Sequence, residues 1–349
     1  MTPELAIAGR RIGPGHPPYV ICELSGNHNG SLERGLAMID AAAATGCDAI
    51  KLQTYTPDTI TLDCDGPGFR IEDGPWAGQT LHQLYAEAYT PYDWHAALFE
   101  RARQRGVTLF STPFDETAVE LLESLGAPAY KIASFEAVDL PLIARVAACG
   151  KPMIISTGLA SLDEMAEALK TAQTGGADGV ALLHCVSSYP APIDEANVRT
   201  VPDLARRFGV VTGLSDHTPG SAAAVAAVAL GAAIIEKHFT LARADGGPDA
   251  AFSLEPAEFT ALVRDCKAAW SALGSATYDE LGSERAAAGH RRSLYVAADI
   301  AAGEPLTEAN IRSVRPGFGL PPKHLPEVLG CRAARDLKFG EPLDWSMIG

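Results

Sequence analysis

Short apolar runs rich in β-branched residues alternate along most of the chain with longer amphipathic stretches rich in alanine and leucine. This alternation is typical of repeated strand-helix units around a parallel sheet, whose buried strands read as continuous apolar runs. The expected strands are 19–23, 49–54, 108–112, 129–134, 153–157, 179–185, 210–215 and 233–238. The expected helices are 32–44, 92–105, 116–125, 140–148, 162–171, 201–208, 221–230 and 255–273.

Eight such units predict an α/β fold whose sheet closes into a (β/α)8 TIM barrel, spanning residues 1–273. Five expected helices are followed by a glycine, the residue that most easily adopts the left-handed backbone of a helix end. These glycines are Gly46, Gly106, Gly126, Gly150 and Gly231. The longest apolar run, 222–235, is too short to span a bilayer, so we expect a buried helix, a stop at Gly231 and a strand.

The periodicity ends after residue 273. Residues 274–290 are small and polar and predict a linker, whereas 291–349 combine a β-like segment at 293–296 with turn-forming glycines and prolines. A module of this size rarely has a stable core on its own. We therefore expect it to dock, either on its own barrel or on that of another subunit.

Composition narrows the functional classes. A hydrophobic content of 47% in 349 residues supports a large core, and a net charge of -15 argues against nucleic acid or an anionic membrane as the main partner. Seven scattered cysteines without a Cys-x-x-Cys pair indicate reduced thiols. No apolar segment follows Arg10 and Arg11 to form a signal peptide, so the sequence predicts a cytoplasmic protein.

Two histidines close successive expected strands. His217 follows strand 210–215 and His238 ends strand 233–238, so both should lie at the barrel face where such folds carry their chemistry. With Glu23 at the end of the first strand, they predict a divalent-metal site with two histidines and one carboxylate, although Glu23 fits a base as well as a ligand. The alternative is that the histidines are hydrogen-bonded core residues.

Two lysines sit inside apolar strand runs, where an unpaired ammonium group would be costly. Lys51 and Gln53 alternate on the second strand and point to the same side, and Lys131 lies on the fourth. Hydroxyl residues end the neighbouring strands; they are Thr112, Ser134, Ser156 and Thr157. Together these groups predict a site for a phosphate and a carboxylate. For any one lysine the alternative is a solvated surface charge.

Several strings, in order along the chain, resemble the sialic acid synthase family, and most closely its pseudaminic acid synthase branch. They are Glu23-Leu24-Ser25-Gly26-Asn27-His28-Asn29-Gly30, Lys51-Leu52-Gln53-Thr54-Tyr55-Thr56, Ser111-Thr112-Pro113-Phe114-Asp115, Tyr130-Lys131-Ile132-Ala133-Ser134, Ser156-Thr157-Gly158, Gly213-Leu214-Ser215-Asp216-His217-Thr218, Glu236-Lys237-His238-Phe239-Thr240 and Arg315-Pro316-Gly317. The resemblance implies a TIM barrel with a C-terminal antifreeze-like (SAF) domain at 291–349.

The resemblance also implies a role for each matched residue. Phosphoenolpyruvate would be held by Lys51, Thr112, Lys131, Ser134, Ser156 and Ser215. Mn²⁺, or else Mg²⁺ or Co²⁺, would be held by His217 and His238, with Glu23 as base or water-positioning group. The amino sugar would contact Gln53, Tyr189 and Asp249, and Arg315 would reach the active site of a partner in a domain-swapped homodimer.

Two strings bear on the sugar. Ser187-Ser188-Tyr189-Pro190 and Ala244-Asp245-Gly246-Gly247-Pro248-Asp249 differ from those of the acetylneuraminate-forming branch. They favour 2,4-diacetamido-2,4,6-trideoxy-altropyranose over N-acetylmannosamine or a diacetamido-mannose, the substrates of N-acetylneuraminate and legionaminate synthases. We expect the long connection 55–91 to cover the sugar end. Two other classes stay open, a metal-dependent aldolase and a carbohydrate-binding scaffold.

Overall fold

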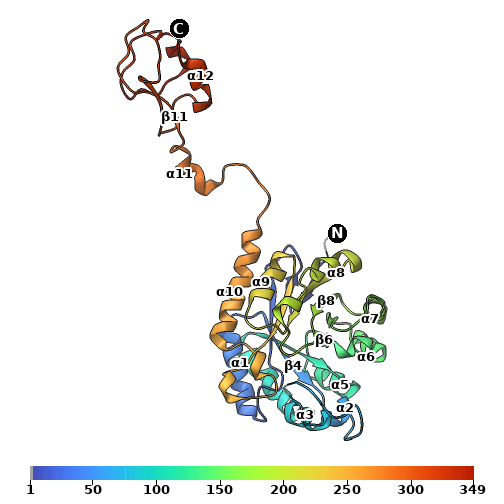
Figure 1. The fold of residues 1–349 in the computed structure, drawn as a ribbon. Coiled ribbons are helices and arrows are strands. Elements are labelled where there is room, and N and C mark those ends of the chain that lie inside the picture. The colour runs from blue at the N-terminus through green and yellow to red at the C-terminus, as the bar shows by residue number, and fades with distance from the viewer. Residues whose placement is uncertain (1–2, 75) are drawn as a thin grey trace. The chain divides into compact units, whose positions relative to one another are not determined.

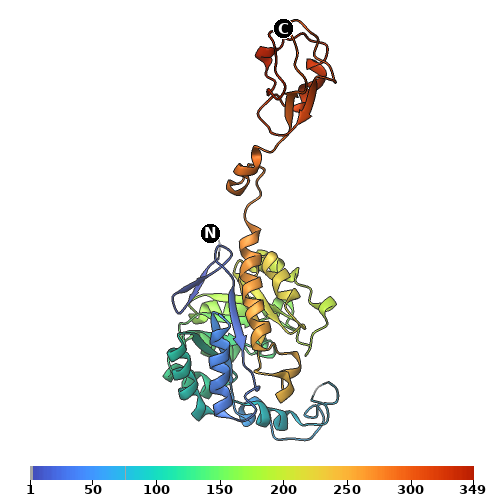
Figure 2. The same cartoon turned by 90° about the vertical axis from the view of Figure 1, so that its left-hand side faces the viewer.

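The computed structural model describes residues 3–74 and 76–349. The chain divides into two compact units, Met1–Gly274 and Ser275–Gly349 (Figures 1 and 2). The first unit contains the repeated strand-helix pattern, and the second contains the short C-terminal elements.

The first unit is built around eight parallel strands that close into a barrel, which confirms the predicted fold. In order around the barrel the strands are β3 (Tyr19–Glu23), β4 (Ala49–Thr54), β5 (Thr108–Pro113), β6 (Tyr130–Ile132), β7 (Met153–Ser156), β8 (Val180–Cys185), β9 (Val211–Asp216) and β10 (Ile234–His238). The barrel closes where β10 pairs with β3, with His238 opposite Glu23 in register. Closure therefore brings the last strand's histidine beside the first strand's carboxylate.

Helices cover the outside of the barrel (Figure 1). They are α1 (Leu32–Ala44), α4 (His95–Arg105), α5 (Glu116–Ser124), α6 (Leu140–Ala147), α7 (Leu162–Gly175), α8 (Thr200–Phe208), α9 (Ala222–Ala229) and α10 (Pro256–Leu273). The expected helix at 92–105 starts as the 3-10 turn Tyr92–Trp94. All five glycines expected after helices have positive φ angles, and each of these helices ends within one residue of its predicted end.

The long apolar run forms helix α9, a turn at Gly231 and strand β10, as expected. The helix is hydrophobic because it packs against the barrel, and Ala224, Ala227 and Val228 are fully or almost fully buried. Within residues 3–74 and 76–349, no helix has the length and apolar content that crossing a membrane requires.

A hairpin that the sequence analysis did not predict closes the N-terminal end of the barrel. Its strands are β1 (Leu5–Ile7) and β2 (Arg10–Ile12), and its buried Ile7 and Ile12 belong to one apolar cluster with Tyr19 and Phe110 from the barrel interior. This cluster fills the barrel interior at the N-terminal ends of the strands. Polar chemistry is therefore confined to the C-terminal end of the strands.

The long connection after β4 contains two short helices, α2 (Pro57–Ile60) and α3 (Leu81–Ala88). Its end packs tightly on the loop between β3 and α1, since a β-carbon at Gly26 would lie 2.8 Å from the Ala88 Cα atom. Trp76 donates from Nε1 to the Pro248 carbonyl at 2.8 Å. The connection is thus anchored at the barrel mouth from two sides.

The second unit has its own buried cluster. Strands β11 (Ser293–Val296) and β12 (Ile311–Val314) pair antiparallel, and short helix α12 (Leu325–Val328) follows. Leu294 and Leu343 are fully buried in this cluster. The β-like segment at 293–296 is confirmed, and within the expected linker a short helix, α11 (Arg285–Ala288), is present.

A buried ion pair joins the ends of β9 and β10 on the helix-facing side. Lys237 is 0% exposed, and its Nζ lies 2.7 Å from the Asp216 carboxylate and contacts the Thr218 carbonyl. Since His217 and His238 each follow a member of this pair, the bridge fixes the relative position of the two imidazoles.

Removing one partner of this pair leaves a buried charge unpaired. We expect Asp216→Ala to lower the free energy of unfolding by about 3–5 kcal/mol, measured by denaturant titration. Asp203→Ala is the control, because Asp203 pairs with Arg206 and Arg207 at the surface and its loss should barely move the midpoint. An Asp216→Ala midpoint equal to that of the wild type would contradict this account.

Candidate active site

Four buried charged side chains meet at the C-terminal end of the barrel. Lys51 Nζ lies 2.5 Å from Glu23 Oε2 and 3.7 Å from Glu236 Oε1. Lys131 Nζ lies 3.6 Å from the same Glu236 oxygen. None of the four is more than 5% exposed. Glu236 therefore bridges the two predicted lysines, and we call these four residues the lysine-carboxylate cluster.

The charges of this cluster depend on one another. Burial opposes the charge of Lys51, but Glu23 and Glu236 outweigh it and raise the pKa of Lys51. Burial opposes the charge of Glu236 as well, yet Lys131 and Lys51 leave its pKa lowered. Burial raises the pKa of Glu23 more than Lys51 lowers it. Glu23 is thus the carboxyl group better suited to exchanging a proton.

Hydroxyl groups stand beside both lysines. Lys51 Nζ donates to Thr112 Oγ1 at 3.1 Å, and Lys131 Nζ donates to Ser156 Oγ at 2.6 Å. Buried ammonium and hydroxyl groups that converge on one point are suited to phosphate and carboxylate oxygens, since charge-assisted hydrogen bonds are the strong ones. The geometry fits the predicted anion site.

The loop after β7 comes unusually close to two other hydroxyls. A β-carbon at Gly158 would lie 2.2 Å from Ser187 Oγ and 2.8 Å from Ser134 Oγ, so a larger residue there would displace them. Ser215 Oγ donates to Glu236 at 3.3 Å. Ser134 and Ser215, both predicted from the sequence, therefore lie at the same barrel mouth as the lysines.

The two predicted metal-binding histidines lie side by side. Their ring centroids are 5.3 Å apart. His217 donates from Nδ1 to the Val186 carbonyl at 3.0 Å, and among the described residues no hydrogen bond to its Nε2 atom is present. His238 Nδ1 is buried without a hydrogen-bond partner in the described part of the chain, and it lies 3.7 Å from Asp249 Oδ2.

This arrangement fits a divalent metal held by two imidazoles. A metal-binding histidine commonly donates its second N–H to a carbonyl, as His217 does. Burial and nearby positive charge hold the pKa of His238 well below its ordinary value, so its ring is in the neutral form that binds metal. Imidazole nitrogens are ligands for divalent transition-metal ions in general, so the pair does not select one metal.

The expected set of two histidines and one carboxylate is not formed. Across residues 3–74 and 76–349, no three His, Cys, Asp or Glu side chains are arranged to hold a metal ion. Glu23 instead pairs with Lys51, and its Oε1 accepts a hydrogen bond from Gln53 at 3.1 Å. The reason is electrostatic, because a buried ammonium group binds the carboxylate more directly than two neutral imidazoles can.

Loop residues form the outer part of the site. The Tyr189 ring lies 4.4 Å from that of His217 and 5.9 Å from that of Trp76. The Phe252 ring lies 5.0 Å from that of His238. These aromatic rings form one wall beside the histidines, and Trp76 shows that the long connection reaches it, which agrees with the expectation that this connection covers one end of the substrate.

The barrel therefore brings twelve of the thirteen predicted residues to one mouth. They are Glu23, Lys51, Gln53, Thr112, Lys131, Ser134, Ser156, Tyr189, Ser215, His217, His238 and Asp249. Arg315 lies in the second unit, where it is exposed.

Sequence reasoning missed two carboxylates. Glu236 bridges the lysines, and its position two residues before His238 on β10 was a usable signal, since alternate strand residues face the same side. Glu136 lies in a 3-10 turn after β6, and its buried Oε2 has no hydrogen-bond partner among the described residues. No periodic pattern marks Glu136, because the turn has neither strand nor helix spacing.

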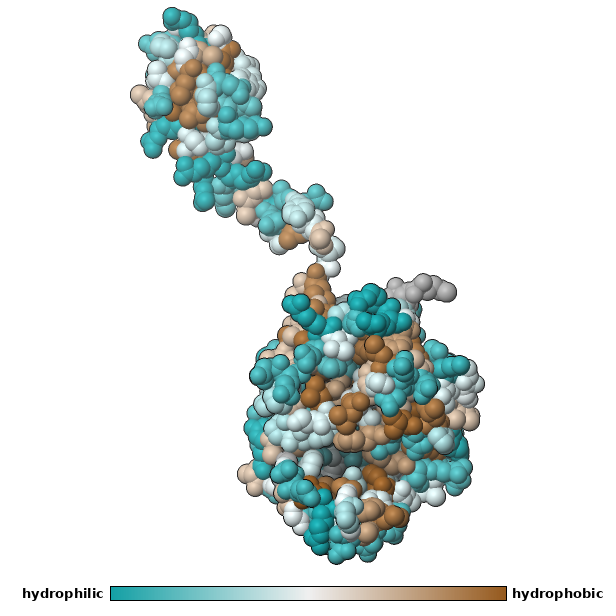
Figure 3. Space-filling view, turned by 45° about the vertical axis from the view of Figure 1, so that its right-hand side comes forward, coloured by the Kyte–Doolittle hydropathy of each residue, from teal (hydrophilic) through white to brown (hydrophobic). Residues whose placement is uncertain are grey.

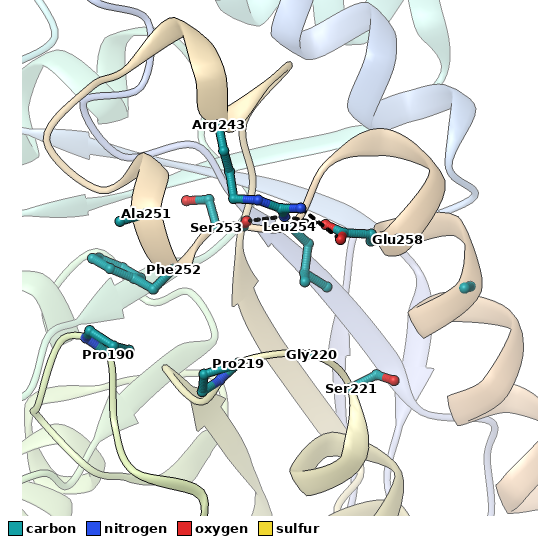
Figure 4. Close-up of a pocket in the computed structure, with 11 residues that line it drawn as sticks. Pro190, Pro219, Gly220, Ser221, Arg243, Ala251, Phe252, Ser253, Leu254 and Glu258 are labelled. Carbon is teal, nitrogen blue, oxygen red and sulfur yellow. Dashed lines mark hydrogen bonds and ion pairs between the residues drawn. The ribbon is translucent and has the colours of Figure 1, made fainter.

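A separate cavity of about 470 Å³ lies behind the aromatic wall, between Phe252 and Pro190 on one side and helix α10 on the other (Figure 4). None of the predicted site residues lines it. The guanidinium group of Arg243, which lines this cavity, is already paired, because it donates to Glu258 at 2.9 Å. The lysine-carboxylate cluster and the histidine pair, not this cavity, form the candidate active site.

The site is a parallel barrel whose mouth carries two buried lysines, two carboxylates and a histidine pair, and a barrel alone does not fix the chemistry. Comparison with known proteins gives the family. The model of the NeuB family matches residues 38–278, and that of the SAF domain matches residues 291–349. The chain therefore belongs to the NeuB family of sialic acid synthases, is an enzyme of this synthase type, and carries the predicted SAF domain.

Individual relatives agree with this assignment. The chain is 44% identical to a pseudaminic acid synthase of Campylobacter jejuni over 93% of this chain and 95% of that protein. It is also 44% identical to the pseudaminic acid synthase of Helicobacter pylori, over 94% of this chain and 96% of that protein. Among solved structures, an N-acetylneuraminic acid synthetase from Leptospira borgpetersenii in complex with citrate superposes with a TM-score of 0.73, at 32% identity, over 82% of this chain and 95% of that one.

Glu136 gives the site a measurable pH dependence. Burial raises its pKa to about 7. Between about pH 4.5 and pH 7 the folded state therefore keeps a proton that the unfolded state has released. The protonated carboxyl group contributes its full stability below about pH 4.5, and this contribution is lost as the pH rises through 7. We expect Glu136→Gln, which stays neutral, to gain about 2 kcal/mol in unfolding free energy relative to the wild type between pH 5 and pH 8. A difference that does not change with pH would refute the raised pKa.

Proposed function

We propose that this protein is a pseudaminic acid synthase, which condenses phosphoenolpyruvate with 2,4-diacetamido-2,4,6-trideoxy-altropyranose and water to give pseudaminic acid and phosphate. The observation that carries the proposal is the convergence of Lys51 and Lys131 with the His217 and His238 pair at one barrel mouth. A metal-dependent aldolase needs the histidines alone. Two buried lysines beside them fit a substrate that carries both a phosphate and a carboxylate.

The lysines and hydroxyls would hold phosphoenolpyruvate deep in the mouth. Lys51 with Thr112, and Lys131 with Ser156, supply two positive centres with donors attached. In the free enzyme Glu23 and Glu236 together offset the charges of the two lysines. An incoming anion would compete with these carboxylates for the two ammonium groups. Binding to the two lysines would align the enol carbon of phosphoenolpyruvate with the sugar aldehyde.

The metal, when bound, would supply Lewis-acid polarisation of the open-chain sugar's aldehyde oxygen. His217 and His238 are the residues that would hold it. The Val186 carbonyl orients the His217 ring for this role. Asp249, close to His238, lies where it can contact a sugar hydroxyl or amide near the aldehyde.

Bond formation joins C3 of phosphoenolpyruvate to the aldehyde carbon. The aldehyde oxygen becomes a hydroxyl by taking up a proton, and the water that adds at C2 replaces that proton by giving one to Glu23. Cationic character then develops at C2, where water adds. Glu23 is the residue placed to hold that water and take its proton, because its pKa is raised and its Oε1 is fixed by Gln53. Collapse of the tetrahedral intermediate breaks the bond between C2 and the phosphate oxygen. The products are a 2-keto sugar acid and phosphate.

The choice of sugar rests on similarity and on the loops. Pseudaminic acid synthases of two organisms share 44% identity with this chain over almost its whole length. The loop Ser187-Ser188-Tyr189-Pro190 carries the Tyr189 ring beside His217 and Trp76. An aromatic wall of this kind accommodates the methyl groups of a 6-deoxy sugar and its acetamido substituents better than a polar one.

The SAF domain would complete the site from a second subunit. Exposed apolar side chains follow β6, β7 and β8; they are Phe135, Val138, Leu159, Leu162 and Ile193. Figure 3 shows one face of the barrel unit, with hydrophobic residues interspersed among hydrophilic ones around a hollow. The SAF domain exposes Phe318 at 73%, three residues after Arg315. We infer a domain-swapped homodimer in which this apolar rim receives the partner's SAF domain.

The proposed reaction is tested by phosphate release. Incubated with phosphoenolpyruvate and Mn²⁺, the enzyme should release phosphate with the diacetamido-altrose and at least tenfold more slowly with N-acetylmannosamine or the diacetamido-mannose. A chelator should abolish turnover, and Mn²⁺ should restore it. Faster turnover with another sugar would reassign the substrate. Cleavage or condensation without phosphate release would favour the aldolase. Full activity in a verified metal-free preparation would refute the proposed role of the metal.

Arg315→Ala tests the role of the SAF domain. If the guanidinium reaches a partner's active site, its loss should raise the KM for the amino sugar by about tenfold, since a charged hydrogen bond of roughly 1.5 kcal/mol or more is lost. Metal binding, measured by calorimetry, and the dimer mass should stay unchanged. Unaltered sugar kinetics would show that the SAF domain only holds the dimer together.

A further inference from the structure

Ser25 is a feature of the barrel mouth that the reaction as described leaves unexplained. It lies in the loop between β3 and α1, is 3% exposed, and has a φ angle of 48°. A left-handed backbone is unfavourable for a residue with a β-carbon. Residues held in such conformations concentrate at functional sites.

The left-handed turn gives Ser25 two contacts to carboxylates. Its backbone N–H donates to Glu23 Oε1 at 3.1 Å. Its hydroxyl donates to Asp249 Oδ2. Gln53 Nε2 lies 3.4 Å from the same hydroxyl. One residue thus contacts the proposed water-holding group and two groups proposed to bind the sugar.

Asp249 depends on Ser25 for its orientation. Asn27 holds the backbone of the loop that carries Asp249, because its Oδ1 accepts from Asp249 N at 3.2 Å and its Nδ2 donates to Ser253 Oγ at 2.9 Å. Neither bond reaches the carboxylate. Within the described residues, the Ser25 hydroxyl is the hydrogen-bond donor to the Asp249 carboxylate.

The turn alone does not require serine. Glycine adopts a positive φ without strain, and the tight approach of Ala88 in this loop falls on Gly26, not on Ser25. The hydroxyl group, which glycine lacks, is therefore the feature that explains a serine at this strained position.

We propose that Ser25 is a positioning residue for the amino sugar, whose hydroxyl orients the Asp249 carboxylate while its amide orients Glu23. This inference rests on the proposed function, since it takes Asp249 as a sugar contact. The phosphoenolpyruvate site should not depend on the Ser25 hydroxyl, because within the described residues that hydroxyl bonds to Asp249 and Gln53 and not to Lys51 or Lys131.

Ser25→Gly separates the hydroxyl from the turn, because glycine keeps the backbone conformation and the amide. We expect the KM for the diacetamido-altrose to rise about tenfold, equivalent to about 1.4 kcal/mol. The KM for phosphoenolpyruvate should stay within about twofold. The melting temperature should be unchanged or higher, since glycine relieves the strain. A merely structural role would instead lower the melting temperature or change both KM values together.

Asn29→Gly is the matched control. Asn29 lies in the same loop with a φ angle of 51°, is exposed, and binds the neighbouring loop through the Asp245 and Gly246 carbonyls at 3.4 and 3.2 Å. Its loss should leave the sugar KM within about twofold.

An unchanged sugar KM in Ser25→Gly, or equal increases in both variants, would overturn the inference while leaving the proposed function intact. Absence of phosphate release by the wild type with every sugar in the panel would overturn both.

Discussion

The active end of this barrel depends on the balance of buried charge in the lysine-carboxylate cluster. Four ionisable groups sit almost without solvent at the strand ends, and each would be strongly unfavourable alone. Two ammonium groups and two carboxylates offset one another, with Glu236 shared between both lysines. The cluster can therefore be buried in the folded protein, because each ammonium group has a carboxylate partner.

The remaining parts of the site are arranged around that cluster. Strand residues supply the anion-binding groups, and their positions are fixed by the barrel register. The histidines come from β10 and from just after β9, and the bridge between Lys237 and Asp216 on the opposite side of these strands holds them in place. Loops supply the groups beyond, including Tyr189, Trp76 and Asp249. In the proposed reaction the strand residues would therefore hold phosphoenolpyruvate, while the loops would face the sugar.

Sequence reasoning recovered the barrel because eight apolar runs and eight amphipathic stretches carry strong periodic signals. It also recovered the strand-end residues, since parallel strands place their C-terminal ends at one face. It failed where contacts depend on tertiary geometry. The N-terminal hairpin was missed because three-residue strands carry no periodicity. Glu23 was grouped with the histidines because strand register does not reveal that Lys51 reaches its carboxylate first. Glu136, in a turn, had no pattern to mark it.

The hairpin of β1 and β2 has a consequence for access to the site. Its Ile7 and Ile12 fill the barrel interior at the N-terminal ends of the strands, so that end of the barrel is closed by apolar side chains. Access to the lysine-carboxylate cluster is then from the loop side. In the proposed reaction both reactants would enter from that side, and the one held by the strand residues would lie deeper than the one that faces the aromatic wall.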